Sequence, residues 1–266
     1  MDVIGYLGPY GSYTSLAAVK LCPDGKKVPY KNFREGFTRL QAGEFDGIVI
    51  PIENTLNGGV LQNIDLLQAT ENVAAVRECT LNIDHRLATL KGADVKKIKR
   101  IYSHAQALEQ CSKYLAKNFP AAQYVPAFST AAGLELVKSE EEACIAGAHT
   151  AREGLQLSPE NIADEKRNFT HFLLIRRGSI PEDTVSEKIY FSVTCKNVSG
   201  ALLKLLQPVC ANGMNMTKIE SRPIKDSPDE YRFFIETEGN YSSPQIKSTL
   251  EEVKRAAKSF KFLGCY

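Results

Sequence analysis

The sequence predicts an α/β fold, and three observations carry that prediction. Through about residue 176, short apolar runs typical of buried strands alternate with segments of helical spacing, as in parallel sheets covered by helices. Several of these runs end in polar turns that open helices. From residue 188 onward the pattern becomes strand, helix, strand, strand, helix, strand. A chain of 266 residues is long enough to hold two domains with this organisation.

Composition and charge exclude several classes of function. Hydrophobic residues make up 43% of the chain, and the formal charge of +2 gives no electrostatic case for nucleic acid as a partner. The N-terminus has no basic region before its first apolar run, and no run approaches the ~18 residues that span a bilayer. We therefore expect a cytoplasmic protein without a membrane partner. Seven scattered cysteines without Cys-x-x-Cys, and four histidines without zinc spacing, predict reduced thiols and no metal.

The first part of the chain alternates regularly. Up to residue 89 we expect a strand at 3–7, a helix at 15–21, a helix at 32–42 opened by a capping box, a strand at 48–50, a helix through 61–67 and extended strands within 73–89. Up to residue 176 we expect a short helix at 94–100, a strand at 101–102, a helix through 110–117, an extended segment at 124–128, a helix at 129–138, a strand at 143–146, a helix around 149–151 and a strand at 172–175.

The last part of the chain reads as a separate compact unit. Residues 178–187 are polar, contain glycine and proline, and are the best candidate for a linker. The expected elements that follow are a strand at 188–194, a helix at 199–211, a strand at 215–224, a turn at 226–229, a strand at 231–237, a helix at 242–259 and a strand at 261–266. This order is the ferredoxin-like βαββαβ arrangement, which carries its helices on one face of the sheet.

Four expected strand ends carry polar residues at the start of a helix: Ser12 with Thr14, Asn54 with Thr55, Ser103 with Gln106, and Ser129 with Thr130. Ligands of such sheets bind beyond the carboxyl ends of strands, and helix starts favour anions. If these ends converge, they form a site for a small polyanion. Each alone is equally consistent with an ordinary helix cap. The stretch Asn168–Phe172 likewise begins a buried strand and could merely cap it. No dinucleotide fingerprint or other cofactor motif is present.

Taken together, these stretches resemble the prephenate dehydratase family over nearly the whole chain. The matching motifs are Gly8–Tyr13, Pro51–Thr55 followed by Gly58, Ser103–Leu108 with Gln110 and Cys111, Ser129–Ala132, Asn168–Phe172, Gly200–Leu202 and Glu220–Pro223. The resemblance implies a two-lobed catalytic domain at 1–177, like the type II periplasmic binding proteins. It also implies a linker at 178–187 and an amino-acid-binding ACT domain at 188–266.

The resemblance also implies an activity. Prephenate would lose carbon dioxide and its ring hydroxyl to give phenylpyruvate, without metal or cofactor. L-phenylalanine would inhibit as an allosteric effector bound where ACT domains pair, in a homodimer or homotetramer. Arogenate as substrate, or a catalytically impaired amino-acid sensor, remains the alternative. A solute-binding protein for transport is disfavoured because no signal peptide is evident.

The residue roles implied by the resemblance fall into three sets. The catalytic set has Thr170 acting on the leaving hydroxyl, with orienting residues Asn54, Ser103 and Gln110. The substrate-binding set contains Gly11, Ser12, Tyr13, Glu53, Thr55, His104, Ser129, Thr130, His171 and Phe172. The regulatory set, for L-phenylalanine, contains Asn197, Gly200, Ala201, Leu202, Glu220, Ser221 and Arg222.

Three positions depart from the family pattern. Ala105 replaces proline and Thr55 replaces serine, which keeps the hydroxyl. His171 replaces arginine, and histidine has an ordinary pKa of ~6.5, whereas arginine is always charged. If His171 contacts a substrate carboxylate, kcat/KM falls as pH rises through neutrality. Side chains alternate along a strand, so His171 should point away from Thr170, which favours a packing role.

Overall fold

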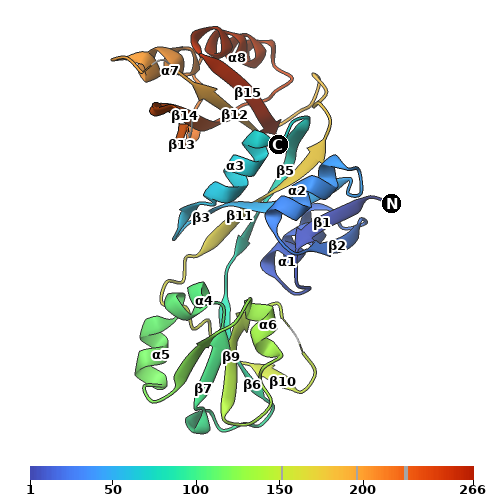
Figure 1. Ribbon diagram of the computed structural model, residues 1–266, viewed down its shortest axis with the longest axis vertical. Coiled ribbons are helices and arrows are strands. Elements are labelled where there is room, and N and C mark those ends of the chain that lie inside the picture. The colour runs from blue at the N-terminus through green and yellow to red at the C-terminus, as the bar shows by residue number, and fades with distance from the viewer. Residues whose placement is uncertain (151, 196, 225–226) are drawn as a thin grey trace.

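The structure is a computed structural model, and it arranges the chain in three tiers along its longest axis (Figure 1). It describes residues 1–150, 152–195, 197–224 and 227–266, and within these ranges it leaves the side chains of residues 130, 131, 228 and 229 undescribed. The middle tier is the first lobe, the lower tier the second lobe and the upper tier the C-terminal unit. No helix in the described part of the chain combines the length and apolar character needed to cross a bilayer.

The first lobe is built from both ends of the segment 1–177. It contains β1 (Val3–Leu7), α1 (Tyr13–Leu21), β2 (Lys26–Tyr30), α2 (Phe33–Gln41), β3 (Gly47–Asn54), β4 (Gly58–Gly59), α3 (Leu61–Ala69), β5 (Val73–Asn82) and β11 (Phe169–Arg177). The predicted capping box forms: Asn32 Oδ1 accepts from the Glu35 amide, and the Glu35 carboxylate accepts from the Lys31 amide. Buried apolar side chains of β3 pack on both sheet faces.

The second lobe is a separate sheet with its own core. Its elements are β6 (His85–Leu90), the 3₁₀ helix η1 (Val95–Lys97), β7 (Arg100–Ser103), α4 (Ala105–Gln110), α5 (Ser112–Asn118), β8 (Gln123–Pro126), α6 (Thr130–Leu134), β9 (Glu142–Gly147) and β10 (Leu155–Leu157). The strand order is β10-β6-β9-β7-β8. Ile101, Leu115 and Ile145 belong to its fully buried core.

The sheets of the two lobes are mixed, whereas the strand–helix alternation predicted parallel ones. In the first lobe β1 pairs in parallel with β2 and β3, but β11 runs antiparallel between β3 and β5. The chain leaves the first lobe along β5 and returns along β11, so these two neighbours must run in opposite directions. The Ile83 amide donates to the Asn168 carbonyl at 2.7 Å, which joins the two connections between the lobes.

The C-terminal unit has the predicted order of elements. It contains β12 (Lys188–Thr194), α7 (Ala201–Ala211), β13 (Met216–Ile224), β14 (Ser227–Glu238), α8 (Pro244–Ala256) and β15 (Ser259–Cys265), and no helix or strand lies at 178–187. The strand order is β13-β14-β12-β15. Helices α7 and α8 cover one face of this sheet (Figure 1). On the opposite face, Tyr190, Phe234 and Leu263 share one core with Ile64 and Leu67 of α3.

One close backbone approach joins the C-terminal sheet to that of the first lobe. Strand β15 pairs in parallel with β5 at Gly264 and Ala75, which makes a single ten-stranded sheet of the described strands. Gly264 has a φ of 151°, and a Cβ at this position would lie 2.3 Å from the Ala75 carbonyl oxygen. Only glycine allows the two strands to approach this closely.

Charged side chains of the C-terminal unit bind α3 and β3. The Lys261 ammonium donates to the carbonyls of Leu67, Gln68 and Thr70, and thereby caps the C-terminus of α3 where the helix dipole favours a cation. In addition, Arg222 binds both carboxylate oxygens of Asp65, and Lys218 binds Glu53 at 2.8 Å.

Several element boundaries differ from the sequence expectation. The helix expected at 129–138 ends at Leu134, and 148–150 form a turn and not a helix. Strand β10 was not expected, because Leu155–Leu157 is only three residues long and pairs with β6 across some seventy residues of chain. The expected turn at 226–229 falls partly outside the described residues, and β14 already begins at Ser227.

Candidate active site

A cavity of about 570 Å³ lies between the two lobes. Its walls come from the glycine turn before α1, the start of α2, the end of β3, the connection at 83–85, the helix α4, the residues before α6, and β11. Four of these segments are the polar strand ends that the sequence singles out. The lobes thus bring together segments that lie far apart in the chain.

Thr170 and Asn54 form the polar centre of this cavity. Both line it and both are largely buried, with 8% and 9% of their surface exposed. They are opposite each other in the β3–β11 ladder, and Asn54 Nδ2 donates to Thr170 Oγ1 at 2.9 Å. Asn54 Oδ1 accepts from the amides of Leu56 and Asn57, which fixes the orientation of the side-chain amide. The Thr170 hydroxyl is therefore an acceptor toward Asn54, and its own proton remains free to be donated.

A chain of buried side chains extends this centre into the second lobe. Asn54 Nδ2 also donates to Asn168 Oδ1 at 2.7 Å, and Asn168 Nδ2 donates to Gln110 Oε1 at 3.3 Å. The same Gln110 oxygen lies 2.9 Å from Nε2 of His85. Burial lowers the pKa of His85 below its ordinary value, so the imidazole is neutral at pH 7.

The loop after β3 is tied across the cavity to α4. Asn57 Oδ1 accepts from Gln106 Nε2 at 2.9 Å and from Gln110 Nε2 at 3.3 Å. The two glutamines lie one helical turn apart, so they present their amides on the same face of α4. These hydrogen bonds connect the first lobe with the second at the exposed edge of the site.

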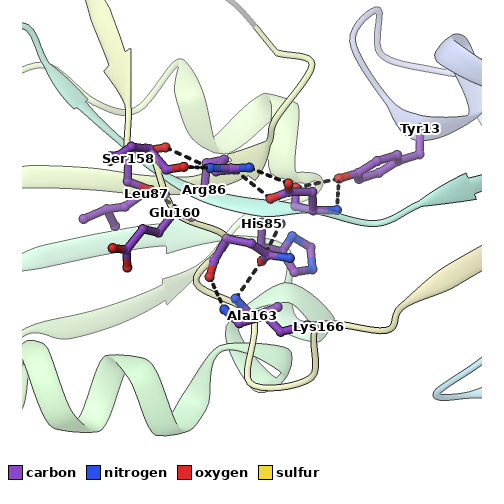
Figure 2. Close-up of polar contacts among 11 residues, drawn as sticks. Tyr13, His85, Arg86, Leu87, Ser158, Glu160, Ala163 and Lys166 are labelled. Carbon is purple, nitrogen blue, oxygen red and sulfur yellow. Dashed lines mark hydrogen bonds and ion pairs between the residues drawn. The ribbon is translucent and has the colours of Figure 1, made fainter.

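The glycine turn shapes the wall at the start of α1. Ser12 caps α1 by accepting from the Ser15 amide, and its hydroxyl donates to the Leu7 carbonyl. The Tyr13 hydroxyl donates to the Asp84 carbonyl and accepts from the Asp84 amide, so it joins the turn to the connection between the lobes. Figure 2 shows Tyr13 reaching toward the segment that carries His85 and Arg86.

Positive charge at the cavity is sparse. Among the described residues that line it, Lys31 is the only lysine or arginine. Its side chain is exposed at the start of α2, and no ion pair of Lys31 occurs within the described part of the chain. The remaining lining donors are neutral, among them the side chains of Gln106, Gln110 and Thr170.

Comparison with known proteins places this geometry in a family. The family model for prephenate dehydratase matches residues 4–180. A prephenate dehydratase of Amycolatopsis methanolica is 32% identical over 271 residues, covering 100% of this chain and 88% of the relative. The chain belongs to the prephenate dehydratase family. The enzyme class expected from the sequence is thereby confirmed.

Solved structures agree with this membership. A prephenate dehydratase from Arthrobacter aurescens, crystallised in complex with L-Phe, superposes with a TM-score of 0.88 at 31% identity and covers 99% of this chain and 89% of that chain. GqqA, described as a novel type of quorum quenching acylase, superposes with a TM-score of 0.87 at 25% identity and covers 99% of this chain and 97% of that chain. The two-lobed α/β fold of the prephenate dehydratase family therefore also occurs in a protein with a different described activity.

Most residues expected to form the prephenate dehydratase site converge on the cavity. The lining includes eight of them: Ser12, Tyr13, Asn54, His104, Gln110, Ser129, Thr170 and Phe172. His104 caps α4 by accepting from the Gln106 amide, and Ser129 caps α6 by accepting from the Ala132 amide. Both therefore also have the structural roles of helix caps. The side chain of Thr130 lies outside the described residues.

Five expected site residues lie outside the cavity lining. Glu53 points away from Asn54, as alternation along β3 requires, and binds Lys218. His171 lies 2.9 Å from Thr80 Oγ1 through its Nδ1, on the face of β11 opposite Thr170 and Phe172. Glu53 and His171 therefore do not line the cavity. Strand alternation is the physical reason in both cases. Their assignment to the substrate-binding set stays a prediction.

The remaining three have structural partners. Ser103 is fully buried, and its hydroxyl donates to the Ile145 carbonyl. Thr55 Oγ1 accepts from the Phe169 amide and donates to the Arg167 carbonyl, which clamps the start of β11. Gly11 has a φ of 81° and its carbonyl lies 3.0 Å from His149 Nε2. Each supports a segment of the site without lining the cavity.

Sequence reasoning missed His85, Asn57 and Lys31 and gave Asn168 no role. Asn168 was visible as the first residue of the matching motif around Thr170. His85 gave no separate signal, because it stands where polar and apolar residues alternate, between Asp84 and Arg86, in a stretch expected simply as strand. Lys31 is an exposed polar residue that lines the cavity only in the folded chain. Asn57 is exposed and does not line the cavity, but it accepts from Gln106 and Gln110, which do.

The residues expected to bind L-phenylalanine lie on two elements of the C-terminal unit. Gly200 has a φ of 77° and precedes α7, while Glu220, Ser221 and Arg222 lie on β13 at the edge of the sheet. Among the described residues, no hydrogen bond joins the two sets. Arg222 instead binds Asp65 of α3, which connects the second set to the first lobe.

Proposed function

We propose that the cavity between the lobes converts prephenate to phenylpyruvate, carbon dioxide and water in the biosynthesis of phenylalanine. Membership of the prephenate dehydratase family supports this reaction. The cavity volume of about 570 Å³ suits a substrate of this size. Its lining combines apolar walls with a small number of converging polar groups.

For this reaction the protein must position the substrate and supply one hydrogen-bond donor to the leaving hydroxyl. Prephenate carries two carboxylates, and the loss of carbon dioxide and the ring hydroxyl is driven by formation of an aromatic ring. The enzyme must hold the dianion, donate a hydrogen bond to the leaving hydroxyl, and remove water from the departing carboxylate. The electron pair of the breaking bond to the carboxylate enters the ring as the hydroxyl departs with the electron pair of its own bond, and a proton from solvent then completes the water.

The observation that carries the proposal is the hydrogen bond from Asn54 Nδ2 to Thr170 Oγ1. An amide nitrogen can only donate, so the hydroxyl must accept there and direct its own proton elsewhere. No acceptor within the described part of the chain takes this proton. Thr170 is consequently poised to donate to the leaving hydroxyl. A threonine is a weak acid, so we assign it hydrogen bonding in the transition state and not full proton transfer.

Other lining groups would hold the two carboxylates. The start of α1 next to Ser12 and Tyr13 offers backbone amides and a partial positive charge. Lys31 adds one mobile full charge at the cavity. Gln110 and Gln106 offer amide groups from the second lobe, which would fix the substrate relative to Thr170.

We also propose that 188–266 is an ACT domain that binds L-phenylalanine and lowers activity, and that the protein assembles into dimers or tetramers through this unit in the cytoplasm. The βαββαβ order and the match of Glu220–Pro223 to the ACT pattern support this proposal. A structural relative whose crystals contain L-Phe supports the effector.

Neither alternative is favoured by a specific observation. Arogenate would require a partner for its ammonium group, and among the described lining residues no aspartate or glutamate is present. A silent sensor would not need the Asn54–Thr170 arrangement. An acylase would need an activated nucleophile, and none of the described lining hydroxyls is hydrogen-bonded to a histidine.

Incubation of the purified protein with prephenate, followed by measurement of phenylpyruvate, tests the proposal. We expect turnover by the wild type, a loss of about 10²–10³ in kcat for Thr170→Val, and retention of most activity in Thr170→Ser, which keeps the hydroxyl. L-phenylalanine should lower the rate of the wild type. No turnover by a folded wild type that still binds L-phenylalanine would instead indicate the sensor.

A further inference from the structure

His85 is the first residue of β6 and lies in the wall of the cavity. It was not among the site residues expected from the sequence. Only 3% of its surface is exposed. Its amide donates to Asn161 Oδ1 at 3.2 Å and its carbonyl accepts from the Ile162 amide at 2.8 Å. Figure 2 shows the loop that holds this part of the strand. The imidazole therefore has little freedom to move.

The surroundings of the ring select one tautomer. Nε2 lies 2.9 Å from Gln110 Oε1, which can only accept, so Nε2 carries the proton. Nδ1 is buried and has no hydrogen-bond partner among the described residues, so a second proton there would be unsatisfied. Desolvation also lowers the pKa of the ring, which keeps it neutral.

The orientation of Gln110 follows from this donor. Its Oε1 accepts from His85 and from Asn168 Nδ2, while its Nε2 donates to Asn57 Oδ1. If the side-chain amide of Gln110 were rotated by half a turn, its NH₂ group would face the N–H groups of His85 and Asn168, and no hydrogen bond could form with either. His85 therefore holds the Gln110 carbonyl toward Asn168.

The orientations of Asn168 and Asn54 follow in the same way from their hydrogen-bond partners, up to the Thr170 hydroxyl. Because Asn168 donates to Gln110, its Oδ1 is left to accept from Asn54. Asn54 in turn shares its second N–H between Thr170 Oγ1 at 2.9 Å and the Phe169 carbonyl at 3.2 Å. Each side-chain amide in this hydrogen-bond network has one orientation in which its donors meet acceptors and its acceptor meets donors. In that arrangement the Thr170 proton is directed away from Asn54.

We propose that His85 is a positioning residue for the dehydration: by donating to Gln110, it holds Gln110 and Asn168 in the arrangement in which Asn168 Oδ1 accepts from Asn54, and so it supports the orientation of Asn54 toward Thr170 that the Leu56 and Asn57 amides also hold. The role of His85 in this proposal runs through Gln110, so we expect its contribution in kcat and not in substrate affinity. The inference rests on the proposed function, because turnover of prephenate is its readout.

The test compares two substitutions of His85. His85→Leu removes the donor, and we expect kcat to fall about 30-fold with KM within about threefold. His85→Gln places an N–H group near the position of Nε2, and kcat should recover to within about fivefold of wild type. Tyr102→Phe is the matched control, since it removes another buried hydrogen bond of the second lobe, from the Tyr102 hydroxyl to Glu142, and should leave kcat unchanged.

A double substitution distinguishes a shared chain from independent effects. Asn168→Ala breaks the chain downstream of His85, so His85→Leu added to it should lower kcat by less than twofold more. If the two losses multiply, or if His85→Leu and His85→Gln lose kcat equally, the inference is overturned. It is also overturned if His85→Leu keeps kcat within twofold. Should His85→Leu fail to fold, His85→Asn replaces it, because its shorter amide cannot reach Gln110.

The outcome for the wild type keeps this inference separate from the proposed function. If the wild type forms no phenylpyruvate, the proposed function fails and the His85 variants are uninformative on kcat. If the wild type turns over and the His85 variants match it, only the positioning role fails.

Discussion

Asn54 and Thr170 face each other across two antiparallel strands, and the amide nitrogen of Asn54 lies 2.9 Å from the hydroxyl oxygen of Thr170. The two residues are 116 positions apart in sequence, yet each restricts the hydrogen bonds that the other can make. The Nδ2 group of Asn54 can only donate, so the Thr170 hydroxyl accepts there and directs its own proton elsewhere. The predictions below follow from this pair and from the contacts around it.

Asn54→Asp should abolish most activity without unfolding the protein. A carboxylate keeps the two bonds from the Leu56 and Asn57 amides, but it cannot donate to Thr170. The Thr170 proton would then turn toward the aspartate. We expect kcat to fall by about 10²–10³, measured as phenylpyruvate formation, with little change in Tm. A variant with near-normal kcat would show that the donor direction is unimportant.

Lys31→Gln should weaken substrate binding. Lys31 supplies the only lysine or arginine charge among the described lining residues, and its exposure limits its effect. We expect KM to rise about fivefold at low salt, kcat to stay within about twofold, and the difference to shrink as salt is added. Lys26→Gln, on an exposed strand position outside the lining, is the control and should behave as wild type. A KM independent of both charge and salt would contradict a role for Lys31.

Glu53→Gln should affect stability more than substrate binding. Its partner Lys218 is only 10% exposed, so a neutral residue at 53 leaves a largely buried ammonium without its counter-charge. We expect a loss of about 1–3 kcal/mol in the free energy of unfolding, measured with urea, and an unchanged KM. A large rise in KM at normal stability would instead place Glu53 at the substrate.

His171→Arg should be nearly neutral for catalysis. The ring lies at Thr80 on the strand face opposite Thr170, so restoring the arginine of the family adds no charge to the cavity. We expect kcat/KM within about threefold of wild type at neutral pH, since surface substitutions of this kind have small effects. The wild type should show no fall in kcat/KM caused by His171 between pH ~6 and ~8.5, the range in which histidine side chains in general can change charge. A fall in that range that disappears in His171→Arg would contradict the structure.

Acid should destabilise the protein through two histidines. Burial lowers the pKa of both His85 and His149 below the ordinary value of 6.5. Below about pH 6.5 the unfolded chain therefore binds protons that the folded chain does not, so the free energy of unfolding falls as pH falls. Urea unfolding at pH 7.5 and pH 5.5 checks the sign. The pH dependence should be smaller in His85→Gln, which removes one of the two groups.

The fold was predictable where local periodicity determines it. The strand–helix alternation up to residue 176 and the βαββαβ order after residue 188 both follow from the spacing of apolar residues. The direction of β11 could not be derived in this way. It depends on the pairing of Thr170 with Asn54 and with Leu81, and such pairing over long sequence separations leaves no local signature.

The site was predictable where a residue carries its chemistry in a matching motif, as Asn54 and Thr170 do. Strand alternation separates Glu53 and His171 from this pair: each adjoins a cavity residue on a strand and points away from it, as the sequence analysis already indicated for His171. His85 was missed for another reason. Its role depends on a hydrogen bond to Gln110 that forms only when the second lobe folds.

The close approach of Gly264 to Ala75 has a mechanical consequence. It makes one continuous sheet of the C-terminal unit and the first lobe, and the shared core of Tyr190, Phe234 and Ile64 reinforces the junction. A rotation of the C-terminal unit about residues 178–187 would break both this strand pairing and the shared core. We therefore infer that an effector bound to the C-terminal unit would not rotate this unit as a separate body. It would act on the cavity through small shifts of the shared sheet and of α3, which packs against the C-terminal unit.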